Sequence, residues 1–145
     1  MDASVTIMTK EDRSYTVRIE KNILREKAAL KTIVIYSPDK DLNVSLSMVL
    51  QDFFNVVTTE DIEALAGYVA IHKANLVIAD AMPTEDLRVR FEKLKQEQRR
   101  LRIIMIFVSQ LIGKKTKEEF NKIVDAVFYK PIELSELIDS INVML

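Results

Sequence analysis

Residues 76–83 of the chain are Leu76-Val77-Ile78-Ala79-Asp80-Ala81-Met82-Pro83. Four apolar residues in a row end in a carboxylate, and a proline follows shortly after it. A short apolar run bounded by turn residues is typical of a strand that is covered on both faces, as in a parallel sheet. Asp80 then lies at the carboxyl end of that strand, where open α/β sheets place their ligand and reaction sites. A plain structural role for Asp80, as the start of a turn or the cap of a helix, explains this stretch equally well.

The chain from residue 31 onward alternates between apolar strand patterns and amphipathic helix patterns. We predict strands at residues 32–36, 56–57, 76–80, 103–108 and 126–129. The helices after these strands are predicted from apolar faces at Leu42, Leu46, Val49, Leu50 and Phe53, at Ile62, Leu65, Ala66 and Val69, at Leu87, Phe91 and Leu94, at Phe120, Ile123 and Val124, and at Leu134, Leu137, Ile138, Ile141 and Leu145. The candidate helix caps are Asp41, Thr84, and Thr116 with Glu119 as a capping box.

Five strand-helix repeats with short connections predict a doubly wound parallel α/β sheet, in which the carboxyl ends of the strands meet at one edge. The sequence has no GxGxxG, no P-loop and no GxSxG motif, so the anchors of a nucleotide-binding protein or a hydrolase are missing. A flavin-binding flavodoxin is also disfavoured, because no Ser-, Thr- or Gly-rich phosphate loop follows the first strand.

Residues 1–30 differ from this pattern. Residues 5–7 and 15–19 alternate between apolar and polar side chains, which is typical of half-buried strands. We predict a β-hairpin with its turn at residues 10–14, and we expect it to pack on the rest of the chain or on a partner, since an isolated hairpin is marginal in water. The predicted organisation is an N-terminal extension, 1–30, followed by one domain, 31–145.

Composition narrows the classes of function. The chain has 145 residues, of which 48% are apolar and 30% are charged, a balance typical of a globular domain. The absence of cysteine excludes disulfides, thiolate metal sites and cysteine nucleophiles. The single histidine, His72, cannot form a histidine cluster, and its place near the end of a helix pattern favours a surface position.

Charge and hydropathy argue against nucleic acid and membrane as partners. The formal net charge is −1, and the basic run at Lys93, Lys95, Arg99, Arg100 and Arg102 is typical of a solvated helix face. No apolar run approaches the roughly 20 residues that span a bilayer, and the first residues lack the pattern of a signal peptide. We therefore expect a cytoplasmic protein.

Three polar residues stand at the ends of apolar strands: Asp80, Ser109 and Lys130. Because parallel strands end at the same edge of a sheet, these residues are expected to converge although they lie far apart in the sequence. A carboxylate nucleophile, a hydroxyl donor and an ammonium group are the parts needed to accept and hold a phosphoryl group. An ion pair between Asp80 and Lys130 without any chemistry is the alternative.

With these residues the chain resembles the receiver domain of two-component response regulators, over residues 31–145. The matching segments are Asn75-Leu76-Val77-Ile78-Ala79-Asp80-Ala81-Met82-Pro83 and Val127-Phe128-Tyr129-Lys130-Pro131. The resemblance implies a flavodoxin-like fold with strand order 2-1-3-4-5 and a phosphoacceptor at Asp80 with Lys130 as its partner. It also places Ser109 where the family has its switch Thr or Ser, and it implies a cis peptide bond between Lys130 and Pro131.

The chain departs from the family pattern in three features. Receivers carry an acidic pair at the end of the first strand that helps to bind Mg²⁺, and Tyr36 and Ser37 stand in its place. A proline follows Asp80 at the third position instead of the family's fourth, and the family's switch aromatic would align near Val127, with Phe128 and Tyr129 as its neighbours. Since Mg²⁺ needs about six oxygen ligands, we expect a weak or absent Mg²⁺ site, with Asp80 and Asp39 as its candidate ligands.

The resemblance leads to a ranked set of hypotheses. The first is a pseudo-receiver, a protein-interaction module of two-component (phosphorelay) signal transduction in which Asp80 is weakly phosphorylated or not phosphorylated. The second is a conventional phosphorylatable receiver that uses Asp80, Lys130 and Ser109. An enzyme ranks last, because no further acid-base pair is evident. The expected partner is a histidine kinase or a downstream signalling protein, and a homodimer is a further option.

Overall fold

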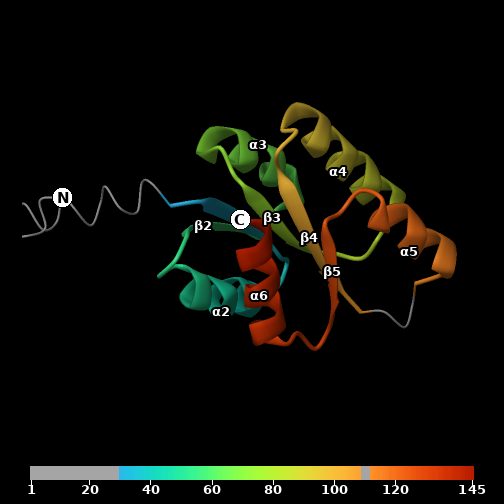
Figure 1. The fold of residues 1–145 in the computed structure, drawn as a ribbon. Helices are drawn as coiled ribbons and strands as arrows, with labels where there is room; N and C mark the ends of the chain where they lie inside the picture. The colour runs from blue at the N-terminus through green and yellow to red at the C-terminus, as the bar shows by residue number, and fades with distance from the viewer. Residues whose placement is uncertain (1–29, 109–111) are drawn as a thin grey trace, which may run out of the picture.

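The computed structural model describes residues 30–108 and 112–145 (Figure 1). In chain order its elements are β1 (Thr32–Tyr36), α2 (Lys40–Leu50), β2 (Asn55–Thr59), α3 (Ile62–His72), β3 (Leu76–Asp80), α4 (Glu85–Glu97), β4 (Arg102–Phe107), α5 (Lys114–Asn121), β5 (Ala126–Tyr129) and α6 (Leu134–Met144). The five strands form one parallel sheet in the order β2-β1-β3-β4-β5. In these two ranges no helix is both long enough and apolar enough to cross a membrane.

Helices cover both faces of the sheet (Figure 1). Helices α2 and α6 pack on one face, and α3, α4 and α5 pack on the other. Successive side chains of a strand point to opposite faces. In β3, Leu76 and Ile78 therefore join the core under α2 and α6, while Val77 and Ala79 join the core under the other three helices. Burial on both faces explains why the central strands are unbroken apolar runs.

The predicted fold is confirmed. The sheet has the five parallel strands and the order 2-1-3-4-5 that the sequence and its resemblance implied. Two strands differ at their ends, since the second runs over Asn55–Thr59 instead of 56–57 and the fourth over Arg102–Phe107 instead of 103–108. The hairpin predicted in residues 5–19 lies outside the described residues.

The predicted cap of α2 is wrong by two positions. The carboxylate of Asp39, not that of Asp41, accepts hydrogen bonds from the N–H groups at the start of the helix, those of Asp41 and Leu42. Asp39 has the extended backbone (φ −91°, ψ 106°) that a capping residue needs. Asp41 already lies inside the first turn, where its negative charge interacts favourably with the positive end of the helix dipole.

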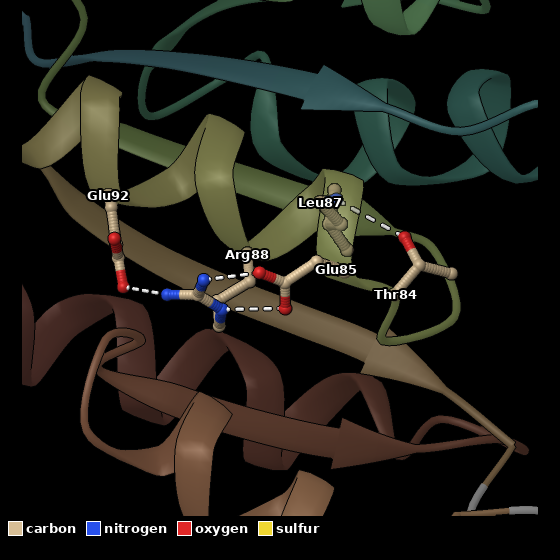
Figure 2. A network of polar contacts seen from close by, with 5 residues as sticks. All are labelled: Thr84, Glu85, Leu87, Arg88 and Glu92. Carbon is tan, nitrogen blue, oxygen red and sulfur yellow. Dashed lines mark hydrogen bonds and ion pairs between the residues drawn. The ribbon is translucent and has the colours of Figure 1, made fainter.

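The other two predicted caps have different outcomes. Thr84 caps α4 as predicted, because its hydroxyl oxygen accepts a hydrogen bond from the N–H of Leu87 at 3.2 Å (Figure 2). The predicted capping box of Thr116 and Glu119 is wrong. Helix α5 begins directly after Gly113 without any side-chain cap, so Thr116 lies within its first turn instead of before it.

Charged pairs lie along α4. Arg88 pairs with Glu85 and Glu92, which lie about one turn away in either direction (Figure 2). The hydrogen bond from Arg88 lowers the pKa of Glu85, but exposed pairs of this kind contribute little to stability. Arg90 pairs with Glu63 of α3 and so connects two neighbouring helices on the same face of the sheet.

Three residues predicted on inner helix faces are exposed instead: Phe53, Ala66 and Leu134. Helix α2 ends at Leu50, so Phe53 lies in the turn that follows and is 66% exposed. Phe54, the next residue, packs against the core under α2 and α6 instead. Apolar spacing does not show where a helix ends, and therefore does not show which of its turns still faces the sheet.

Candidate functional site

Ser37, Asp80 and Lys130 lie together at the carboxyl edge of the sheet. Asp80 ends β3, while Ser37 directly follows β1 and Lys130 directly follows β5. The residues two positions before them all pack in the core under α2 and α6: Ile35, Ile78 and Phe128. Because side chains alternate along a strand, the three polar side chains are turned to that same face of the sheet.

Both carboxylate oxygens of Asp80 are bonded. The Nζ of Lys130 lies 2.7 Å from Oδ1, and the hydroxyl of Ser37 donates a hydrogen bond to Oδ2, also at 2.7 Å. Asp80 is only 6% exposed, whereas the side chain of Lys130 is 36% exposed. A buried carboxylate needs an opposite charge and hydrogen-bond donors, and these two residues supply both.

Ser37 connects Asp80 to the start of α2. Its Oγ accepts a hydrogen bond from the N–H of Asp39 at 2.9 Å while its proton is donated to Asp80. A hydroxyl has one proton to donate, so the buried Ser37 has none left for another acceptor. Asp39 is the residue that caps α2. Two hydrogen bonds therefore connect the Asp80 carboxylate to the residue that caps α2.

Asn43 of α2 holds the chain around Ser37. Its Nδ2 donates to the carbonyl oxygens of Ser37 at 2.9 Å and of Thr59 at 3.3 Å. The amide orientation follows from these two acceptors, because a side-chain oxygen cannot donate to them. Asn43 is 4% exposed, and its Oδ1 has no hydrogen-bond partner among the described residues. Apolar periodicity gives no signal for a buried amide, so the sequence did not indicate this residue.

Tyr36 lies on the opposite face of the sheet from Ser37 and packs against the core under α3, α4 and α5. The pKa of Tyr36 is raised, first by burial and then by the negative charges of Asp80 and Asp61, while Arg90 acts in the opposite direction. A phenol with a raised pKa keeps its proton at neutral pH. Tyr36 therefore does not supply the negative charge that a divalent cation requires.

The backbone fixes Lys130 at the edge of the sheet. The peptide bond between Lys130 and Pro131 is cis, as the resemblance implied. The N–H of Lys130 donates to the carbonyl oxygen of Phe107 at 3.0 Å, which joins the end of β5 to the end of β4.

An exposed aromatic residue lies beside this edge. Tyr129, the last residue of β5, is 43% exposed and packs edge-on against Phe107, with ring centroids 5.3 Å apart. The Nζ of Lys117 lies 5.4 Å from the centroid of the Tyr129 ring, a cation–π distance. Val127, near which the resemblance places the switch aromatic of receivers, packs against the core. The aromatic residue at this edge is thus two positions further along β5.

The groups around Asp80 do not fit a Mg²⁺ site. Mg²⁺ prefers near-octahedral oxygen ligands, with carboxylates to supply the charge. The groups bonded to Asp80 are an ammonium and a hydroxyl that donates its proton, so neither supplies a negatively charged ligand for a cation. Within residues 30–108 and 112–145, no three His, Cys, Asp or Glu side chains are grouped so that they could hold a metal ion.

The predicted site residues are placed as follows. Asp80 and Lys130 are in contact, and Asp39 lies at the start of α2, where its carboxylate caps the helix. Ser109 lies outside the described residues. The hydroxyl that contacts Asp80 is that of Ser37, which the sequence indicated only as a replacement for an acidic residue. A signal was present, since Ser37 directly follows the apolar strand that pairs with the strand ending at Asp80.

Comparison with known proteins identifies the fold. Chemotaxis protein CheY4 of Vibrio cholerae is similar over 81% of this chain and 100% of its own, with a TM-score of 0.69 and 16% sequence identity. The N-terminal signal receiver domain of a two-component response regulator from Bacteroides fragilis covers 81% of this chain and 98% of its own, with a TM-score of 0.68 and 17% identity. A two-component response regulator from Clostridium difficile covers 79% of this chain and 94% of its own, with a TM-score of 0.69 and 17% identity.

The chain therefore has the flavodoxin-like fold of response regulator receiver domains, as the resemblance implied. At 16–17% identity, the likeness extends to the fold alone. No protein-family model and no curated protein matches the sequence.

Proposed function

We propose that the chain is a receiver-like domain of two-component (phosphorelay) signal transduction that acts by binding another protein, with Asp80 weakly phosphorylated or not phosphorylated. The observation that supports this proposal is that the Asp80 carboxylate is both bonded and buried. Its two carboxylate oxygens are held by Lys130 and Ser37, and it is 6% exposed. A phosphoacceptor must instead offer an oxygen to the incoming phosphorus while a metal ion offsets the charge.

The charges around Asp80 favour a domain that binds a protein partner without accepting a phosphoryl group. A phosphoryl group that approaches Asp80 brings negative charge to a carboxylate, and Lys130 is the cation that contacts this carboxylate among the described residues. Tyr36 and Ser37 stand where receivers have their acidic pair, and the raised pKa of Tyr36 keeps its phenol neutral. Metal ions supply much of the transition-state stabilisation in phosphoryl transfer. Phosphorylation of Asp80 without a bound metal ion would therefore be slower by orders of magnitude.

The partner that we propose is a histidine kinase or a downstream signalling protein, and the location is the cytoplasm. We propose no catalytic activity for the chain itself. Lys130 is the part of the pair that a partner at the carboxyl edge of the sheet can contact, since 36% of its side chain is exposed. The exposed ring of Tyr129, the residue directly before Lys130 at the end of β5, adds an aromatic contact surface there.

A conventional phosphorylatable receiver is the second candidate. The contact of 2.7 Å between Lys130 and Asp80 favours it, because a lysine in this place can neutralise a phosphoryl group on the carboxylate. In this alternative Ser109 supplies the switch hydroxyl, and Asp39 joins Asp80 as a Mg²⁺ ligand.

A Mg²⁺ titration followed by beryllium fluoride, a phosphoryl analogue, separates the two candidates. Backbone amide NMR of the complete chain would follow the residues around Asp80, with Asp80→Asn as the control. We expect no saturation by Mg²⁺ at millimolar concentration, and no further shifts when beryllium fluoride is added. Saturable Mg²⁺ binding that Asp80→Asn abolishes, followed by an analogue-dependent shift, would establish the conventional receiver instead.

A further inference from the structure

The amino-terminal edge of the sheet, at the opposite end of the strands from Asp80, holds a basic cavity. Its volume is about 510 Å³, and its lining residues are Lys31, Asn75, Lys95, Arg99, Arg100, Leu101, Arg102, Met144 and Leu145. Five of these side chains are cationic and none is acidic. The volume falls within the roughly 300–1,000 Å³ that is usual for small-molecule sites.

Only part of this positive charge is neutralised. Asp125 accepts hydrogen bonds from Lys95 at 2.6 Å and from Arg102 at 3.1 Å. In the part of the chain that the structure describes, Lys31 and the two arginines at positions 99 and 100 make no ion pair. With Asp125 counted, the five cations leave an excess of four positive charges.

Uncharged donors line the same cavity. Arg99 and Arg100 occupy the middle of a turn that is closed by the N–H of Leu101, and their own N–H groups donate no hydrogen bond within the described ranges. The Oδ1 of Asn75 accepts from the N–H of Thr32 at 2.8 Å. Its Nδ2 protons are then available, since they have no partner among the residues described. Backbone and amide N–H groups next to cations are the usual components of an anion site.

We propose that this cavity binds a small multivalent phosphate anion, of the size of a di- or triphosphate. Arginine guanidinium groups bind phosphate oxygens in bidentate fashion, and two adjacent arginines suit a ligand with more than one phosphate. A small ligand is favoured over nucleic acid because the cationic residues line one cavity and the chain carries a net charge of −1. Five residue steps along β3 separate Asn75 from Asp80, which is roughly 16 Å at 3.3 Å per residue, so the two sites are separate.

Isothermal titration of the complete chain with inorganic tripolyphosphate, ATP and orthophosphate tests the proposal. The test variant is Arg99→Glu/Arg100→Glu, and Arg99→Ala/Arg100→Ala repeats the test with a smaller change of charge. The matched control is Lys114→Glu/Lys115→Glu, which makes the same change of charge at the exposed start of α5. All four positions are exposed, so the variants are expected to fold.

We expect tripolyphosphate to bind about tenfold or more tightly than orthophosphate, and the arginine variants to lose about tenfold or more of that affinity. The control should change the affinity by less than about threefold, through long-range charge alone. If ATP binds as tightly as tripolyphosphate and depends on the same arginines, the ligand is a nucleotide. If ATP binds more weakly than tripolyphosphate, the ligand is a free polyphosphate. Both outcomes support the proposal.

Three results would overturn it. The first is tripolyphosphate affinity that is the same in the parent and in both arginine variants. The second is equal loss of affinity in the control, because a general charge effect would then explain the binding. The third is a single-stranded oligonucleotide that binds through the same arginines more tightly than tripolyphosphate, which would make the cavity part of a nucleic-acid surface.

Discussion

The Nζ of Lys130 lies 2.7 Å from Oδ1 of Asp80, so the ends of β5 and β3 are joined by an ion pair across the intervening strand β4. The pair is asymmetric in its exposure. The carboxylate is almost fully buried, whereas more than a third of the lysine side chain is in contact with solvent. Removal of the lysine therefore leaves a buried charge, and removal of the carboxylate leaves a cation that water can still reach.

The first prediction concerns the strength of this pair. A double-mutant cycle with Asp80→Asn, Lys130→Met and the double variant should give a coupling energy of about 1–3 kcal/mol, between the values for exposed and fully buried pairs. Lys130→Met should be the more destabilising single change, because it leaves the buried carboxylate without a cation. Denaturant unfolding measures all four proteins. Additive effects of the two single changes would mean that the pair does not form in solution.

The second prediction concerns Ser37. Ser37→Ala removes the donor to Asp80 and the acceptor for the N–H of Asp39, so it should lower the free energy of unfolding by about 1–3 kcal/mol. Ser45→Ala is the matched control, because Ser45 is exposed on the same helix that Asp39 caps. The control should stay within about 0.5 kcal/mol of the parent. Equal stability of the two variants would exclude the proposed connection between Asp80 and α2.

The third prediction concerns the pH dependence of Tyr36. A raised pKa means that the folded state favours the neutral phenol, so this contribution to stability is present below the ordinary pKa of 10.0 and is lost as the pH rises through the raised value. Tyr36→Phe should therefore lose less stability than the parent between about pH 9 and 11. In Asp80→Asn, the pKa of Tyr36 should fall toward its ordinary value but stay above it, because burial remains. NMR of ring-labelled tyrosine measures this shift, and an unchanged titration would show that the two groups do not interact.

The fourth prediction concerns Asp125. Burial alone would raise its pKa, but hydrogen bonds from Lys95 and from the N–H of Ile103 outweigh burial and lower it. The stability that Asp125 contributes is therefore present above the ordinary pKa of 3.8 and is lost as the pH falls through the lowered value. Asp125→Asn should cost about 1–2 kcal/mol at neutral pH, a value reduced for partial exposure.

As the pH falls into the acid range, Asp125→Asn should lose less stability than the parent. Asp139→Asn, at an exposed position of α6, is the control and should stay within about 0.5 kcal/mol of the parent at neutral pH. Parallel pH profiles for the parent and Asp125→Asn would contradict the assignment of this acid-sensitive contribution.

The fold was predictable because its signal is repeated in each strand-helix unit. The apolar run that ends at Asp80 needs cover on both faces, and that requirement specifies a parallel sheet with helices on either side. The ends of helices were less predictable. Phe53 continues the apolar spacing of α2 but lies beyond the last turn, and the capping role of Asp39 depends on a backbone conformation that the spacing does not encode.

The candidate site was predictable in part. Strand alternation and a common sheet edge are enough to bring Asp80 and Lys130 together from opposite halves of the domain. The hydrogen bond from Ser37 and the buried amide of Asn43 were not predicted, because each depends on side-chain packing at a single position. Polar residues that are buried by their neighbours leave no periodic pattern in a sequence.

We propose that Lys130 and Ser37 hold Asp80 in a state that resists phosphorylation. The most direct test is intact-mass spectrometry of the complete chain after incubation with acetyl phosphate and Mg²⁺, beside Asp80→Asn and Tyr36→Asp/Ser37→Asp. We expect little or no added phosphate on the parent and none on Asp80→Asn. The double variant restores two carboxylates and should gain phosphate faster than the parent. Rapid stoichiometric phosphorylation of the parent that Asp80→Asn abolishes would contradict the claim and establish Asp80 as a working phosphoacceptor.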